Sequence, residues 1–456
     1  MRKLVKNNII FGIVLGGLVF GGIVYAASYY AKDVQYEPTD TNWNVSNVED
    51  ALNDLYNSRK CNMNGAKPII NGDLIPITLS NNGTVTYANT KEIWYNYCNR
   101  EWANAVILVD SPSKTYKVGD TIKEEDIESY FVWIPRYRYK LWNTGTASKN
   151  VHEIEIEFET KETKASTGDE NGEWLTHPAF TTLDVNGIWV GKFETGYKGA
   201  TSTSGAEVNG SDSSKIIVKP NVYSWRKNTV YNFFVASYNY NRNLDSHMMK
   251  NTEWGAVAYL SHSKYGIGYE VNINNNSSYK TGYSALPSTN QQTYPATSGD
   301  GSTYNNAYNT EIGYLASTTG NITGVYDMSG GAHEYMASYR SSTPGESGFT
   351  TSTISNYDSK YFDTYNASST VTSYNYRILG DATGEMGQFK SYLDSDNSSR
   401  YHNSWYADLS NFVESSRPWF IRGGNYDYGI LAGQFYFARY PGAVYNHIGS
   451  RLVLSP

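Results

Sequence analysis

The pattern of hydrophobic and polar positions predicts short strands far more often than helices. The segment YFVWIPRYRYKLW, starting at Tyr130, alternates and is rich in β-forming residues until Pro135 interrupts it or marks a sheet edge. A second strand-like segment, GIWVGKFETGY, starts at Gly187. Shorter runs such as DLIPITL and TVTYAN, separated by turn residues, predict a small β-rich module over residues 60–115.

Predicted helices are few. The segment SNVEDALNDLYNS is amphipathic, and Ser46 with Glu49 forms a capping-box pattern, so residues 28–59 are expected to form a short helical stalk. Two further helical patterns begin near Ser224 and His247. Long stretches of Ser, Thr, Asn, Gly and Tyr connect these elements and predict extended loops.

The first residues have the order of a secretory signal. A basic stretch, MRKLVKNN, precedes an uncharged and largely apolar run and then small residues. The apolar run is long for a signal core and short for a comfortable membrane span. Residues 1–27 are therefore expected to be a signal peptide or an uncleaved membrane anchor. Either interpretation predicts a secreted or cell-surface protein, which an uncleaved hydrophobic segment would anchor at the membrane.

The composition of the chain indicates which classes of partner the protein can bind. The chain has 456 residues, a net charge of −7 and no basic tract, which argues against a nucleic-acid partner. Its 42 tyrosines, together with many Asn, Ser and Gly residues, are typical of binding surfaces. The two cysteines, Cys61 and Cys98, are a candidate disulfide in an oxidising compartment.

Several motifs resemble, in the correct order, those of the formylglycine-generating enzyme (sulfatase-modifying factor) family. TGNITGVYDMSGGAHEY, at 319–335, is similar to that family's N-x-x-G-L-x-D-M-x-G-N-V-W-E-W signature, although His333 and Tyr335 depart from it. RGGNY and the final GSRLVLSP stand where the family has R-G-G-S-W and its closing strand. The resemblance implies that residues 125–456 form an α+β, C-type-lectin-like domain with short twisted antiparallel strands, few helices and many loops.

Structural roles alone can also explain the residue types in these motifs. Glycines supply tight turns, and short polar side chains such as Asp327 can cap local backbone. Arg422 and Arg451 could satisfy buried carbonyls or Glu334 in a loop-rich core. We therefore expect a structural role for the matched set: Asn321, Gly324, Asp327, Gly330, Glu334, Arg422, Gly423, Gly424 and Arg451.

The family's catalytic chemistry is not expected here. That chemistry requires paired thiols late in the domain, and this chain has no cysteine after Cys98. The seven histidines show no close metal-binding spacing, so no metal is assigned. No cofactor is expected, although family members often hold structural calcium, to which Asp327 or Glu334 could contribute. The alternative is a catalytic relative of the enzyme that acts on an extracytoplasmic substrate.

The segment 425–450 lies between the RGG motif at 422–424 and the strand-like residues 451–454, but its own residues follow no period. It resembles the variable region of diversity-generating retroelement targets, in which adenine-directed mutation rewrites codons but never produces Lys, Glu, Trp or Met. From Ile421 to Ser450 none of these four residue types occurs. A Tyr-rich loop of low charge is the plainer alternative. Diversification would make the protein a non-catalytic binding or adhesion protein for a protein or glycan on another cell, phage or host surface. Its expected exposed contact residues are Asp427, Tyr428, Ile430, Leu431, Ala438, Arg439, Tyr440, Pro441, Tyr445, Asn446 and His447.

Overall fold

A computed structural model describes most of the chain, which divides into two compact units, Met1–Cys61 and Asn62–Pro456. The described ranges are 33–37, 46–52, 62–109, 115–141, 153–169, 172–286, 306–366, 377–383 and 404–456.

In the first unit a short helix starts at residue 48. The backbone N–H of Asp50 donates to the side chain of Asn47 at 2.7 Å, so Asn47 caps the helix instead of Ser46, one residue later than the sequence pattern indicated. Gln35 and Asn47 form an isolated β-bridge beside it.

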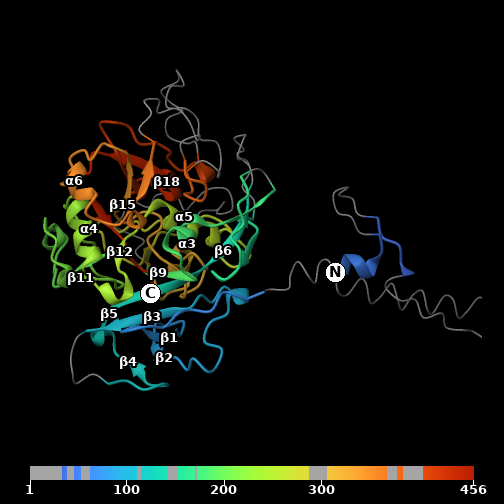
Figure 1. Cartoon of the computed structure of the whole chain (residues 1–456). Coiled ribbons are helices and arrows are strands. Elements are labelled where there is room, and N and C mark those ends of the chain that lie inside the picture. The colour runs from blue at the N-terminus through green and yellow to red at the C-terminus, as the bar shows by residue number, and fades with distance from the viewer. Residues whose placement is uncertain are drawn as a thin grey trace, which may run out of the picture. The chain divides into compact units, whose positions relative to one another are not determined.

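The second unit is built on an eight-stranded sheet (Figure 1). The residues of the expected β-rich module are part of this sheet, since their strands continue it beyond β5. The strands in spatial order are β12 (His247–Met248), β20 (Leu452–Leu454), β9 (Gly187–Gly191), β5 (Ile127–Pro135), β3 (Asn104–Leu108), β1 (Ile75–Leu79), β2 (Val85–Tyr87) and β4 (Thr121–Ile122).

The centre of this sheet is covered on both faces. Phe131, Val132, Trp133 and Ile134 of β5 are all fully buried although they alternate between the two faces. Both sets of side chains therefore belong to the core, as is expected when other elements pack on each side of a sheet.

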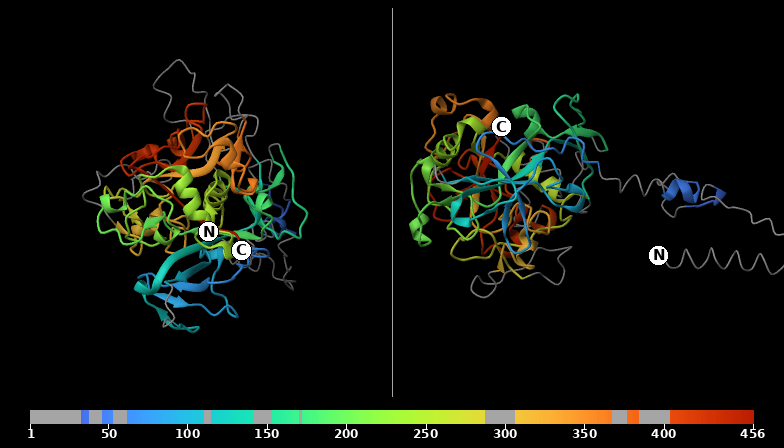
Figure 2. Two further views of the ribbon diagram at one scale, coloured as in Figure 1. Left: turned by 60° about the vertical axis from the view of Figure 1, so that its left-hand side comes forward. Right: turned by 90° about the horizontal axis from the view of Figure 1, so that it is seen from below.

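A second, five-stranded sheet includes two strands, β18 and β19, from the segment that resembles a variable region. It lies at the opposite end of this unit from β1 and β2, as Figures 1 and 2 show. Two of its pairs, β15 with β17 and β17 with β18, are antiparallel, but β15 pairs in parallel with β16 and β19, which departs from the expected antiparallel arrangement. Its strands are β15 (His333–Arg340), β16 (Asp363–Tyr365), β17 (Trp419–Gly423), β18 (Gly433–Tyr440) and β19 (Ile448–Ser450).

Short helices lie between the two sheets in Figure 1. Helix α5 is buried along its whole length and contacts both β5 and β15, while α4 contacts β12 and β15. The α-helices described in this unit are α3 (Pro178–Leu183), α4 (Val230–Tyr238), α5 (Asn251–Ser261) and α6 (Thr351–Ile354). The remaining strands are β6 (Tyr137–Lys140), β7 (Ile156–Phe158), β8 (Trp174–Thr176), β10 (Gly196–Tyr197), β11 (Ile216–Ile217), β13 (Tyr283–Ser284) and β14 (Asn306–Ala307).

The structure confirms a β-rich fold with few helices. It also requires a correction, because no helix among the described residues is both long and apolar enough to cross a membrane, contrary to the expected N-terminal anchor. The hydrophobic segment within residues 1–27 lies outside the described ranges. Cys98 is disulfide-bonded, and Cys61, the only other cysteine of the sequence, also lies outside them.

Candidate ligand-binding surface

The matched motif residues form a buried network that fixes the loop before β15. Asp327 adopts a left-handed backbone conformation, with φ of 59°. Its carboxylate accepts hydrogen bonds from the backbone of Gly282 and the side-chain amide of Asn274, both at 2.9 Å. Lys192 holds the same loop from beneath, because its Nζ donates to the carbonyls of Ile322 and Gly324 at 2.6 and 2.9 Å.

The centre of this network is an ion pair between Arg451 and Glu334, both fully buried. Arg451 Nε and Nη2 donate to the two carboxylate oxygens at 3.0 and 2.6 Å. The same guanidinium also donates to the carbonyls of Gly191 and Asp327. Burial raises the pKa of Glu334 to about 6, while Arg451 opposes that rise. One arginine thus joins β9, β15 and the motif loop.

A third buried carboxyl group lies beside this pair. Burial raises the pKa of Glu194 well above its ordinary value, and the nearby Asp327 and Glu334 raise it further. Its oxygens accept hydrogen bonds from the Ser224 hydroxyl and the backbone of Ala332. Both oxygens of this buried carboxyl group thus have hydrogen-bond donors, which suits a structural role.

The RGG motif ends β17 and turns toward the C-terminal segment. Arg422 is fully buried and donates to the carbonyl of Ala382 at 3.2 Å, and burial lowers its pKa to about 10. Gly423 and Gly424 have φ of 81° and 82°. A side chain at Gly424 would also collide with Ala432, so this turn requires glycine.

Several of the expected contact residues lie close together, linked by ring contacts among Tyr428, Tyr440, Tyr445, His447 and His333, and we name this region the variable surface after the sequence resemblance. Asp427 and Asn446 are exposed, and Tyr428, Leu431, Tyr440, Pro441, Tyr445 and His447 are half-buried. The side chain of Ile430 lies outside what the structure describes.

Two expected contact residues are not exposed, which corrects the sequence interpretation. Ala438 is only 6% exposed and Arg439 only 3%. Arg439 forms an ion pair of 2.8 Å with Glu414 and donates to the carbonyl of Phe412. Residues 409–414 run beside β18, and every residue of this strand before Tyr440 is buried, so alternation along the strand does not expose Ala438 or Arg439.

The variable surface has an aromatic centre. The rings of Tyr440 and Tyr445 meet edge to face, with centroids 4.9 Å apart, and His447 lies 6.0 and 5.6 Å from them. Tyr428 packs on a small buried cluster that includes Ala432. Beneath them lies His333, fully buried, with its ring 4.9 Å from that of Tyr428. Sequence reasoning marked His333 only as a departure from the family signature.

The backbone of this surface is held from outside the segment. Each carbonyl from 441 to 447, except that of Val444, accepts a hydrogen bond from a residue elsewhere in the chain. Arg226 binds the carbonyl of Asn446, and its guanidinium lies 3.9 Å from the Tyr279 ring centroid. The other donors are Glu346 N to Pro441 (2.7 Å), Val230 N to Gly442 (3.2 Å), Tyr335 Oη to Ala443 (3.0 Å), Lys227 N to Tyr445 (2.9 Å) and His333 N to His447 (3.0 Å).

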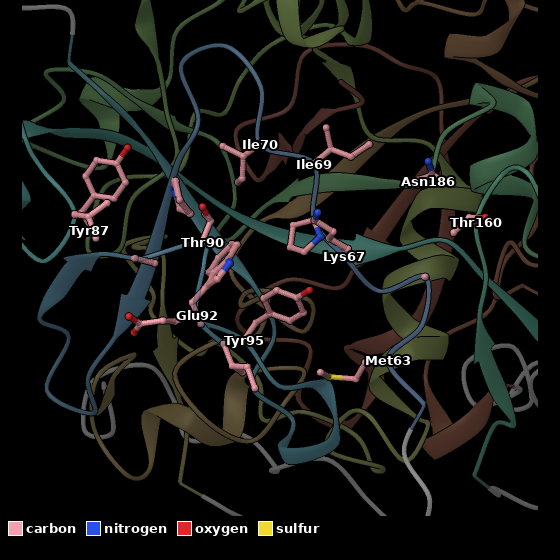
Figure 3. Close-up of a pocket in the computed structure, with 17 residues that line it drawn as sticks. Met63, Lys67, Ile69, Ile70, Tyr87, Thr90, Glu92, Tyr95, Thr160 and Asn186 are labelled. Atoms are coloured by element: carbon pink, nitrogen blue, oxygen red, sulfur yellow. The ribbon is translucent and has the colours of Figure 1, made fainter.

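A separate cavity of about 890 Å³ opens among the N-terminal strands of the second unit (Figure 3). Lys67, Glu92 and Tyr95 line it, together with Ile93, which is 83% exposed. None of the expected contact residues lines this cavity. Sequence reasoning did not assign a site here, because its wall combines residues from several strands and loops.

The described residues show no candidate catalytic centre of the kind the family uses. Within the described ranges no cysteine is free, and no group of three or more His, Cys, Asp or Glu residues could hold a metal ion. The fully buried His177 and His262 have pKa values lowered by burial to about 3 and about 4. The catalytic alternative gains no support from this geometry and stays a prediction.

Comparisons with known proteins give little further guidance. No protein-family model matches the sequence, and no curated protein matches it either. Among solved structures, the Major Tropism Determinant P3c variant is similar at 14% identity and a TM-score of 0.24, over 83% of this chain and 93% of that chain. A TM-score this low does not establish a common fold.

Proposed function

We propose that this chain is a ligand-binding protein with a C-type-lectin-like domain related to the formylglycine-generating enzyme family, and that residues 425–450 form a diversified binding surface. Its ligand is a protein or glycan on another cell, a phage or a host. The observation that carries the proposal is the set of hydrogen bonds that hold the carbonyls of residues 441–443 and 445–447 from outside the segment.

These hydrogen bonds do not depend on the side chains they support. A main-chain carbonyl is present in every residue type, so a substitution at Tyr445, Asn446 or His447 changes the surface but keeps the acceptor. The donors, among them Arg226 and Lys227, lie in sequence far from the segment. A surface of this kind can change its contacts without losing its backbone conformation, as binding loops on rigid scaffolds do.

The side chains now present suit a binding role. Tyrosine supplies a large, rigid contact area and a polar hydroxyl at low cost in conformational entropy. Tyr440 and Tyr445 are only half-buried, and the neighbouring Val444 is 37% exposed. Aromatic side chains clustered beside an exposed aliphatic residue are typical of binding sites.

Sequencing the codons for residues 425–450 across a population of the source organism tests this proposal. We expect substitutions in the codons of Asp427, Tyr428, Tyr440, Tyr445, Asn446 and His447. Within each codon they should fall at the bases that are adenine in the template copy of this segment. The matched internal control is the set of residues that hold the segment.

Arg226, Lys227 and Tyr335 should not vary in the same population. A segment as constant as these residues, or substitutions spread evenly over both sets, would show that the surface is not diversified.

A further inference from the structure

His333 lies at the base of the variable surface with its hydrogen-bonding groups unused. Its side chain is fully buried, and neither Nδ1 nor Nε2 has a hydrogen-bond partner among the described residues. Buried polar atoms in native structures nearly always have a partner, because leaving one unpaired costs free energy. A histidine with both nitrogens unpaired therefore requires an explanation.

The side chains around His333 are largely those expected to contact a ligand. Tyr428 meets the imidazole edge to face at 4.9 Å, His447 lies at 5.5 Å and Tyr440 at 6.4 Å between ring centroids. Tyr436 stacks on it at 5.4 Å from within β18. The first three are half-buried, so the imidazole lies one layer of side chains below the surface.

The main chain fixes the position of this imidazole. His333 is the first residue of β15, where it pairs with Ile448 of β19, and its backbone N–H donates to the carbonyl of His447 at 3.0 Å. Burial and the neighbouring His447 lower the pKa of His333 well below its ordinary value. The ring is consequently neutral and offers one N–H donor and one nitrogen acceptor.

We propose that His333 is the constant hydrogen-bonding group of the variable surface and that the ligand is a carbohydrate; this inference rests on the proposed binding function. A sugar carries several hydroxyl groups, each able to donate or accept, so one can donate to the bare ring nitrogen of His333 and another can accept from its N–H. The C–H face of a pyranose ring packs against the rings of Tyr428 and Tyr440.

The decisive variant is His333→Phe, which keeps a flat buried ring but removes both nitrogens. The wild-type protein and this variant are applied to a panel of immobilised oligosaccharides, and the melting temperature of each is measured. His262→Phe is the matched control, because it removes another fully buried imidazole that faces Trp405 and Phe435 instead of the variable surface.

We expect the wild type and His262→Phe to bind at least one oligosaccharide, and His333→Phe to lose at least tenfold in affinity. The melting temperature of His333→Phe should be unchanged or higher, since no internal hydrogen bond is lost. A lower melting temperature would show that the imidazole is structural and would overturn the inference. Equal binding by His333→Phe would also overturn it.

Failure of the wild type to bind any oligosaccharide would exclude the carbohydrate ligand. The proposed function would survive that result if the codons for residues 425–450 vary in the population, since the ligand would then be a protein. The two experiments therefore separate failure of the inference from failure of the proposed function.

Discussion

Replacing Arg451 with Met should destabilise the protein by about 3–5 kcal/mol near pH 8. The methionine fills much of the volume but donates nothing, so Glu334 loses both partners of its carboxylate oxygens. The carbonyls of Gly191 and Asp327 lose a donor as well. The large cost arises because an unpaired charge remains where no water can solvate it.

The loss should depend on pH in a definite direction. Burial raises the folded-state pKa of Glu334 from an ordinary value of 4.5 to about 6. A carboxyl group with a raised pKa contributes stability that is complete below its unfolded pKa and is lost as the pH rises through its folded pKa. In the wild type this loss amounts to about 2 kcal/mol, from a difference of about 1.5 pH units at roughly 1.36 kcal/mol each.

Without Arg451, the pKa of Glu334 rises further, and so does that of Asp327, which Arg451 also lowers. The loss of stability then continues at higher pH than in the wild type. The deficit of the variant should consequently be smaller at pH 5, where both carboxyl groups can be protonated, than at pH 8.

Urea unfolding followed by tryptophan fluorescence at pH 5 and pH 8 measures this difference. The control is the double variant Glu334→Gln/Arg451→Met, which has no charge at position 334 and should show a much weaker dependence on pH. The reasoning is refuted if Arg451→Met has the same deficit at both pH values, or if its deficit at pH 8 is below about 1 kcal/mol.

Two further predictions concern glycine and histidine. Gly331 has φ of 67°, and a side chain there would overlap the buried Glu194 carboxylate; we expect Gly331→Ala to cost about 2–4 kcal/mol in urea unfolding. Gly199→Ala, with φ of 87° and open space around it, should cost only about 1 kcal/mol, and equal losses would contradict the argument. Burial holds the folded-state pKa of His262 at about 4, below its ordinary 6.5, so the wild type should lose about 2 kcal/mol between pH 8 and pH 5 from this group. His262→Phe should lack that contribution, and parallel pH profiles for the two proteins would disprove it.

The sequence was sufficient to predict the regular elements and one of their key contacts. Alternating β-forming residues placed strands at Tyr130 and Gly187, and the turn residues Asn82 and Gly83 lie between β1 and β2, which pair as a hairpin. The expectation that an arginine satisfies Glu334 is confirmed for Arg451. These predictions succeeded because they depend on local periodicity, on turn geometry and on the cost of an unpaired buried charge.

Exposure within the variable surface could not be predicted in the same way. Arg439 has the residue type of a surface position, yet residues 409–414 cover it and Glu414 pairs with it. The position of His333 beneath Tyr428 depends on the pairing of β15 with β19, which are distant in sequence. Periodicity reports which side of a strand a residue occupies, but only the tertiary fold decides whether that side is covered.

The position of β20 determines when, during translation, the eight-stranded sheet can be completed. This strand follows the variable surface in sequence, yet it pairs inside the eight-stranded sheet between β12 and β9. Arg451, immediately before it, reaches back across 260 residues to the carbonyl of Gly191. A ribosome must therefore translate the whole variable segment before the sheet can close. A stop codon within residues 425–450 removes Arg451 and β20, so Glu334 loses its ion-pair partner, and we expect the truncated chain to be destabilised and open to proteolysis.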